Sequence, residues 1–199
     1  QIISIGGQGT SFLKSSHPQR TEQPRTMTEN YAWAPDIYDV LKDLDVRQVA
    51  YVPDAGHARL LKMCEADNAM RCIPLTTEEE GISLSAGAWL GGERAVMLLQ
   101  SSGVGNCINM ISLANTCRFP LLMLVTMRAQ WREFNPWQKP MGEGTRPALE
   151  AMGVKVTQVD EPDQVGETVR SAGEQAYGWP DMAAVLLHQK LMPVKTFGK

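Results

Sequence analysis

Short apolar segments alternate with amphipathic segments from Asn30 to the end of the 199-residue chain, and this alternation limits the possible folds more than any other feature. Residues 95–100 and 120–126 are continuous apolar runs, as expected of strands that are covered on both faces. Residues 35–44 carry apolar side chains at the spacing i, i+3, i+4, i+7, which marks one face of a helix. The pattern therefore predicts alternating strands and helices.

Six segments are predicted to be strands, and a helical segment separates each of them from the next. The predicted strands are residues 48–52, 71–75, 95–100, 120–126, 154–159 and 182–187. The predicted helices are residues 35–44, 57–65, 78–90, 104–116, 146–152 and 162–177. This order favours right-handed crossovers and predicts an α/β fold: a single doubly wound, mainly parallel six-stranded sheet with helices on both faces. Ligands bind such sheets at the carboxyl ends of the strands, so we expect a site in the loops that begin at Pro53, Leu75, Gln100 and Thr126.

Composition and missing motifs exclude several classes of protein. Nineteen Lys and Arg residues face 22 Asp and Glu residues without a dense basic run, which argues against nucleic-acid binding. No stretch approaches the roughly 20 apolar residues of a membrane-spanning helix. The chain has no GxxxxGK[ST] phosphate loop and no GxSxG elbow, and Ile108 stands where the third glycine of a GxGxxG motif would be.

The cysteines and the first residues set further expectations. The four cysteines lack any CxxC or Cys/His spacing, so we expect reduced thiols in a cytoplasmic protein and no metal site made by this chain. Residues 1–26 are rich in Gly, Ser, Gln and Pro and show no apolar period. We expect them to be a flexible native arm or an added leader, with Met27 as a candidate native start, and residues 27–199 to form one domain.

Two of the predicted loops can be interpreted in a structural or a functional way. In the loop that begins at Pro53, Asp54 could cap the following helix, or the loop could place His57 in the mouth of a site. Residues 78–80 are three consecutive glutamates that open a helix of Gly, Ser and Ala. They could simply offset the positive end of the helix, but such small side chains also let a partner or a ligand approach closely.

Two further loops are open to the same pair of interpretations. Residues 100–106 form a polar, glycine-rich bend, in which Ser102 could cap a helix or the bend could form a wall around a flat ring. Residues 127–145 are long, aromatic and basic for a connector in a small domain. Arg128 and Arg132 in this segment could bind a sulfonate, phosphonate or carboxylate, or the segment could be an interface with a partner protein.

These segments together carry a family resemblance. The chain reads VPD at residues 52–54, EEEGISLSAGAWL at 78–90, LLQSSGVGNCIN at 98–109 and PLLMLVTMR at 120–128. In this order, the four motifs resemble the pyrimidine-binding (Pyr) domain of thiamine-diphosphate-dependent decarboxylases, and more narrowly that of the sulfopyruvate and phosphonopyruvate decarboxylases. The resemblance extends from about Asn30 to the end of the chain.

The resemblance implies a catalytic role for a glutamate at the start of the small-residue helix. In the family this glutamate binds N1′ of the cofactor's aminopyrimidine and lies about nine residues before the Gly of an Ala-Gly pair. Counting back from Gly87 gives Glu78, with Glu79 as the second choice. The implied reaction is decarboxylation of 3-sulfopyruvate to sulfoacetaldehyde and CO2. Phosphonopyruvate, another 2-oxo acid, a carboligation, or a non-catalytic regulatory subunit of the same fold are the alternatives.

The predicted site residues follow from these loops and from the resemblance. The predicted catalytic residues are Glu78 and His57. The predicted cofactor-binding residues are Glu78, Pro53, Asp54, Ser102, Gly103, Gly105 and Asn106. The predicted substrate-binding residues are Arg128, Arg132 and Gln138. After Asp54 and after Arg128 the sequence departs from the family pattern, which leaves the identity of the 2-oxo acid open.

One motif of the family is missing from this chain. Members bind Mg2+ and the cofactor's diphosphate through a GDG motif followed by an Asn, and no GDG occurs here. The resemblance therefore implies a separate diphosphate-binding beta subunit that carries GDG…N and holds the metal. We expect a hetero-oligomer with this partner, or self-association of a chain purified alone.

Overall fold

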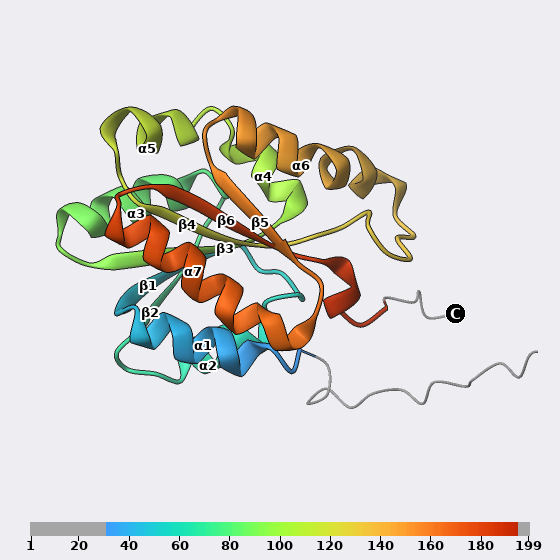
Figure 1. Ribbon diagram of the computed structural model, residues 1–199, viewed down its shortest axis with the longest axis horizontal. Coiled ribbons are helices and arrows are strands. Elements are labelled where there is room, and N and C mark those ends of the chain that lie inside the picture. Colours follow the sequence, from blue (N-terminus) through green and yellow to red (C-terminus); the bar gives the residue numbers. More distant parts are fainter. Residues whose placement is uncertain (1–30, 195–199) are drawn as a thin grey trace, which may run out of the picture.

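Six strands alternate with helices along residues 31–194, the part of the chain that the computed structural model describes (Figure 1). The leader predicted for residues 1–26 lies outside this range. The strands are β1 (Val46–Tyr51), β2 (Arg71–Pro74), β3 (Arg94–Gln100), β4 (Leu121–Thr126), β5 (Lys155–Val159) and β6 (Met182–Leu187). All five strand pairs are parallel, in the order β2-β1-β3-β4-β6-β5. The predicted fold class is therefore confirmed.

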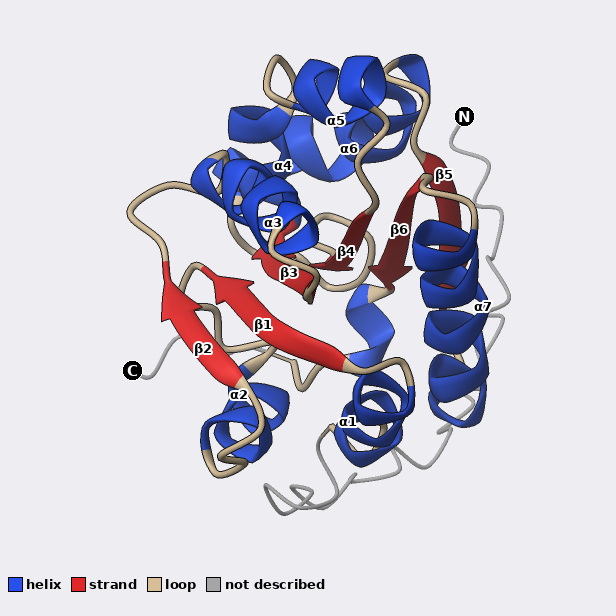
Figure 2. Cartoon of the chain, turned by 90° about the vertical axis from the view of Figure 1, so that its left-hand side faces the viewer, coloured by secondary structure: helices blue, strands red, loops and turns tan. Residues whose placement is uncertain are grey.

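The helices cover both faces of this sheet (Figure 2). They are α1 (Ala34–Asp43), α2 (Ala58–Glu65), α3 (Glu80–Leu90), α4 (Ser101–Cys107), α5 (Ile111–Cys117), α6 (Lys139–Ala151) and α7 (Val165–Gly178). The short 3-10 helices are η1 (Pro136–Gln138), η2 (Pro162–Gln164) and η3 (Gln189–Leu191). Helices α1, α2 and α7 lie on one face of the sheet, and α3 to α6 lie on the other (Figure 2).

Alternate side chains of the central strands fill two separate cores. In β4, Leu122 and Leu124 pack toward α1 and α7, whereas Leu121, Met123 and Val125 pack toward α3 to α6. All six residues of β4 and all six of β6 are buried. This is why the sequence showed continuous apolar runs there instead of an alternation of apolar and polar residues.

The strand order of the sheet reverses between β1 and β3, because β2 lies on one side of β1 and all later strands lie on the other side. β2 pairs with one edge of β1, and β3 pairs with the other edge. The loops that leave β1 and β3 therefore diverge at the carboxyl edge of the sheet, which creates an opening between them. The segment 127–138 and η3 lie at this same edge, at the right-hand end of the molecule in Figure 1.

Two predicted helices have different boundaries in the structure. The single helix predicted for residues 104–116 is two helices, α4 and α5, and α4 begins directly after β3 at Ser101. The helix predicted for residues 146–152 begins at Lys139, so residues 139–145 of the segment predicted to be irregular are helical. Gly103, Gly105 and Gly142 lower the helix propensity of these turns, which hid them from the sequence pattern.

Gly142 in α6 has a packing reason to be a glycine. A Cβ atom built at this residue would lie 2.4 Å from both the Ala129 Cβ and the Arg128 carbonyl oxygen. The first turns of α6 can therefore lie directly against the segment that leaves β4. Within residues 31–194, no helix combines the length and the apolar character that crossing a membrane requires.

We predict that Leu122→Ala lowers the free energy of unfolding by about 2–5 kcal/mol, because the Leu122 side chain is fully buried in the middle of the sheet. Urea unfolding monitored by circular dichroism measures this change. The matched control is Leu90→Ala in α3, where the side chain is 75% exposed and the change should stay within about 0.5 kcal/mol. A loss below about 1 kcal/mol at Leu122 would contradict the two-sided packing of β4.

Candidate functional site

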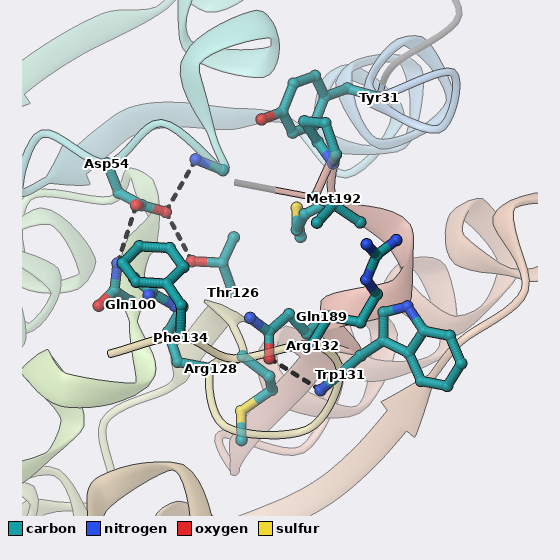
Figure 3. A pocket seen from close by; sticks show the side chains of 14 residues that line it. Tyr31, Asp54, Gln100, Thr126, Arg128, Trp131, Arg132, Phe134, Gln189 and Met192 are labelled. Carbon is teal, nitrogen blue, oxygen red and sulfur yellow. Dashed lines mark hydrogen bonds between the residues drawn. The ribbon is translucent and has the colours of Figure 1, made fainter. Parts of the chain in front are cut away.

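A network of hydrogen bonds around Asp54 joins the carboxyl ends of three strands (Figure 3). Gln100, at the end of β3, donates from Nε2 to Asp54 Oδ1 at 3.1 Å. Thr126, at the end of β4, donates from Oγ1 to Asp54 Oδ2 at 2.6 Å, and the Gly56 N–H donates to the same oxygen at 3.1 Å. Asp54 follows β1, so the network ties the loops on both sides of the opening to one carboxylate.

These residues form one wall of a pocket at the carboxyl edge of the sheet. Its other walls come from the segment 127–138, from Tyr31 near the start of the described chain, and from the residues that follow β6. Burial and the negative charge of Asp54 raise the pKa of Tyr31, so its hydroxyl keeps its proton at neutral pH. The pocket thus combines polar strand ends with the aromatic rings of Tyr31, Trp131 and Phe134.

His57 lies in the protein core and does not line this pocket. Its side chain is 2% exposed, and its Nε2 lies 3.0 Å from the carbonyl oxygen of Leu124. Nδ1 is buried and has no hydrogen-bond partner among the described residues. Burial lowers the pKa of His57, which favours the neutral ring. The sequence left open whether this loop places His57 in the mouth of a site, and the structure corrects that possibility: the ring is turned inward to the β4 backbone and does not line the pocket. A catalytic role for His57 stays a prediction.

The carboxylate of Glu133 organises the segment that leaves β4. Arg128 binds it with two hydrogen bonds, from Nη2 at 2.6 Å and from Nε at 2.7 Å. The backbone N–H groups of Asn135 and Ala129 donate at 2.9 and 3.2 Å, and Gln189 Nε2 donates at 3.0 Å. Five donors on one carboxylate whose side chain is 5% exposed fix the path of this segment.

Gln189 also holds the segment from the other side. Its Oε1 accepts hydrogen bonds from the backbone N–H groups of Gln130 at 2.9 Å and of Trp131 at 3.0 Å. Gln189 lies in η3, directly after β6, so a side chain 59 residues further along the chain fixes the backbone next to Arg132. Ala129 and Arg132 adopt left-handed backbone conformations, with φ of 63° and 49°.

The two arginines of this segment differ in their partners. The Arg128 side chain is 11% exposed, and two of its N–H groups donate hydrogen bonds to Glu133. Its guanidinium carbon lies 5.8 Å from the centre of the Phe134 ring. Arg132 is exposed and lines the pocket, and among the described residues its guanidinium has no acidic partner. In Figure 3 this guanidinium stands in the opening of the pocket on the side of Met192.

A second group of predicted residues lies on the α3–α4 side of the same edge. Glu78 is half-buried, and its Oε2 accepts a hydrogen bond from Asn106 Nδ2 at 2.7 Å. A Cβ atom built at Gly103 would lie 2.2 Å from Glu78 Oε1, so the carboxylate rests directly on the glycine backbone of α4. Oε1 accepts no hydrogen bond from a described residue. This leaves one oxygen of a positioned carboxylate available to a ligand.

The three consecutive glutamates have different environments. Glu80 turns back, and its Oε2 accepts the N–H of Thr76 at 2.8 Å, as a helix-capping side chain does. Glu79 is the exposed residue before the first turn of α3. Glu78 is the one that contacts α4. The three glutamates therefore differ in what they contact, and the choice of Glu78 over Glu79 as the catalytic residue stays a prediction.

The remaining predicted site residues are spread over this edge. Ser102 lies between the two groups and donates from Oγ to Gln100 Oε1 at 3.0 Å. Pro53 is exposed beside Asp54, and Gly105 faces Met141 of α6. Gln138 does not line the pocket, and its Oε1 is buried without a described partner. Their predicted roles in cofactor or substrate binding stay predictions.

Two residues that organise the site were not predicted from the sequence. Glu133 lies inside the basic segment, and nothing in the sequence pattern indicated that it would be the partner of Arg128. Gln189 follows the carboxyl end of β6. Ligands bind parallel sheets at the carboxyl ends of the strands, and β6 is such a strand, so the sequence did contain a signal for Gln189.

Comparisons with known proteins identify the family to which this geometry corresponds. Residues 33–142 match the family model described as "Thiamine pyrophosphate enzyme, N-terminal TPP binding domain". The chain is 34% identical to the sulfopyruvate decarboxylase subunit alpha of Methanococcus maripaludis over 152 residues. This aligned region covers 76% of this chain and 91% of that protein. The corresponding subunit of Methanocaldococcus jannaschii is 34% identical over 142 residues, or 71% of this chain and 84% of that protein.

Two further similarities cover smaller parts of longer proteins. The phosphonopyruvate decarboxylase of Streptomyces viridochromogenes is 36% identical over 98 residues, which is 49% of this chain and 25% of that enzyme. Among solved structures, a 2-oxoglutarate:ferredoxin oxidoreductase of Magnetococcus marinus superposes with a TM-score of 0.61 at 13% identity, over 90% of this chain and 33% of that chain. This last similarity concerns the fold alone.

We predict that Glu133→Gln lowers the free energy of unfolding at pH 7 by about 2–3 kcal/mol, and that this difference becomes clearly smaller toward pH 3. The ion pair with Arg128, helped by the N–H groups of Asn135 and Ala129, lowers the pKa of Glu133 to about 2. An unfolded Glu titrates near 4.3, so the stabilisation is complete above about pH 5 and fades as the pH falls toward 2. Urea unfolding of both proteins between pH 7 and pH 3 measures the difference.

The control for this prediction is Glu150→Gln, which removes another Arg–Glu ion pair. Glu150 pairs with Arg146 at 2.9 Å on the surface of α6, where its side chain is 49% exposed. Its loss should change the free energy of unfolding by less than about 0.5 kcal/mol at any pH. Equal, pH-independent effects of the two substitutions would contradict the role given to Glu133.

Proposed function

Because the chain belongs to the thiamine pyrophosphate enzyme family and matches its N-terminal TPP binding domain, we propose that it is the alpha, pyrimidine-binding subunit of a thiamine-diphosphate-dependent 2-oxo acid decarboxylase. The observation that carries the proposal is the carboxylate of Glu78, held by Asn106 and resting on Gly103 at the start of α4. Relatives with the name sulfopyruvate decarboxylase subunit alpha, similar over most of their length, support it.

The residues around Glu78 fit the pyrimidine end of the cofactor. Asn106 fixes Oε2, which leaves Oε1 able to hold a proton together with a ring nitrogen of the aminopyrimidine. Gly103 carries no side chain that would push the carboxylate out of this position. When bound, thiamine diphosphate supplies a thiazolium ring that takes up electrons as CO2 leaves a 2-oxo acid. Glu78 is the residue of this chain to which we assign the proton at N1′.

The diphosphate end of the cofactor needs a second subunit in this proposal. The sequence contains no GDG motif, and within residues 31–194 no three His, Cys, Asp or Glu side chains group as ligands for a metal. We assign Mg2+ and the diphosphate to a beta subunit that carries GDG…N. The relatives' designation as subunit alpha supports such a partner. The cytoplasmic location expected from the unpaired cysteines belongs to the same proposal.

The proposed substrate is 3-sulfopyruvate, a 2-oxo acid with a second anionic group. The pocket beside Asp54 contains both arginines of the segment 127–138, and a guanidinium binds sulfonate and carboxylate oxygens well. The similarity to phosphonopyruvate decarboxylases keeps phosphonopyruvate as a second candidate substrate. Turnover of both acids by the assembled enzyme would distinguish them by the ratio of kcat/KM values.

We predict that Glu78→Gln lowers kcat of the assembled decarboxylase at least about 100-fold, because an amide cannot share the proton as a carboxylate does. Release of CO2 from 3-sulfopyruvate, with the beta subunit present, measures the effect. Glu80→Gln is the matched control, since Glu80 is turned to Thr76 and should leave kcat within about threefold. Near-normal activity of Glu78→Gln would favour a regulatory subunit, and a loss only with Glu79→Gln would move the assignment by one residue.

We also predict that Gly103→Ala weakens thiamine diphosphate binding by the assembled enzyme at least tenfold. The new Cβ would occupy the place of the Glu78 carboxylate and displace it. Calorimetry with thiamine diphosphate and Mg2+ measures the affinity, for this chain alone and with the beta subunit. Gly178→Ala is the control, because a Cβ there meets no atom within 4 Å. Tight binding to the chain alone would contradict the division of the cofactor site between two subunits.

A further inference from the structure

We propose that Arg132, and not Arg128, binds the second anionic group of the substrate and so determines the selectivity for a dianionic 2-oxo acid. This inference rests on the proposed function and makes it more specific. The sequence offered the two arginines as equivalent candidates. The structure distinguishes them by their partners and by their backbone conformation, and the charge on the opposite wall of the pocket determines how an anionic substrate is oriented.

The first argument concerns the hydrogen bonds that each arginine has left to offer. Arg128 gives Nε and Nη2 to Glu133, and this pair is almost fully buried. Withdrawing Arg128 toward a ligand would leave the Glu133 carboxylate buried without its cation, which is costly. Arg132 lines the same pocket, and no carboxylate of the described residues neutralises it. Its bidentate edge is therefore available to an anion without the loss of an existing pair.

The second argument concerns the backbone that directs Arg132 into the opening. Its φ of 49° lies in the left-handed region, which an arginine adopts only when its surroundings impose it. Gln189 binds the N–H groups of the two preceding residues, and the next residue is Glu133 with its five donors. Fixed points on both sides of Arg132 thus impose this conformation. The result is a guanidinium that lines the pocket on the side of Met192 (Figure 3).

The third argument concerns the charge on the opposite wall. Asp54 makes no ion pair with any residue that the structure describes, and its oxygens accept three neutral hydrogen bonds. An anionic group placed on this side would meet a carboxylate, whereas on the other side it would meet Arg132. The pocket therefore orients a dianionic acid, with its second anionic group toward Arg132 and away from Asp54.

The first test uses the full chain alone and sulfoacetate, which carries a sulfonate and a carboxylate but no 2-oxo group. We expect calorimetry to show saturable binding, weakened by high salt, and Arg132→Asn to weaken it about 10- to 100-fold and to flatten the salt dependence. Asn tolerates the left-handed conformation, so the loop keeps its path. Arg132→Lys, which keeps the charge but loses the bidentate edge, should have an intermediate affinity.

The matched control is Arg118→Asn. Arg118 is also a left-handed arginine, with φ of 56°, but it ends α5 at the opposite edge of the sheet. This control should bind sulfoacetate within twofold of the unsubstituted chain. Equal losses in the two variants, an affinity of Arg132→Asn within twofold of the original, or no saturable binding by the unsubstituted chain would each overturn the proposal.

The second test uses the complex with the beta subunit. Arg132→Asn should raise KM for 3-sulfopyruvate at least tenfold while changing KM for pyruvate less than threefold. An enzyme that decarboxylates 3-sulfopyruvate with the same KM after this substitution overturns the role of Arg132 and leaves the proposed function intact. A complex that decarboxylates no 2-oxo acid overturns the proposed function, whereas the binding of sulfoacetate to the chain alone still decides the role of Arg132.

Discussion

Burial of the central strands on both faces confines the polar chemistry of this protein to the ends of the strands. In β4 and β6 every side chain except that of Thr126, at the carboxyl end of β4, belongs to one of the two apolar cores. A charged group in the middle of these strands would be buried without a partner, at a cost of several kcal/mol. Because the strands are parallel, their carboxyl ends share one edge, and the hydrogen bonds of Asp54 to Gln100 and Thr126 connect three of these ends.

The bend at residues 100–103 forms a wall common to the two groups of candidate residues. Gln100 binds Asp54 on the pocket side and accepts a hydrogen bond from Ser102, while Gly103 lies against Glu78 on the other side. This arrangement depends on α4 beginning directly after β3 without a connecting loop. Glu78, to which we assign the proton, and Asp54 in the wall of the pocket therefore contact the same turn between strand and helix from opposite sides, and such shared support keeps reacting groups in register.

The sequence predicted the elements of the fold well because the strongest signals came from burial. All six strands were predicted, since long apolar runs such as that of β4 have few alternative explanations. The helical turns containing Gly103 and Gly142 were missed, because tertiary packing and not propensity decides their conformation. Of the loops in which a site was expected, those that follow β1, β3 and β4 contribute residues to the pocket. The orientation of His57 and the pairing of Arg128 with Glu133 were not predictable, since each depends on a contact that spacing along the chain does not encode.

Side-chain oxygens take the place of a regular hydrogen-bond ladder in the segment after β4. Oxygens of Glu133 and Gln189 accept the N–H groups of Ala129, Gln130, Trp131 and Asn135, which neither a helix nor a strand satisfies. The left-handed conformations of Ala129 and Arg132 cost roughly 1–2 kcal/mol each. Charge-assisted bonds to a buried carboxylate are of a size that offsets such a cost. Glu133 and Gln189 thus set the direction of Arg132 without having to touch a substrate themselves. Replacing either of them should therefore change the selectivity for a dianionic substrate, as replacing Arg132 should.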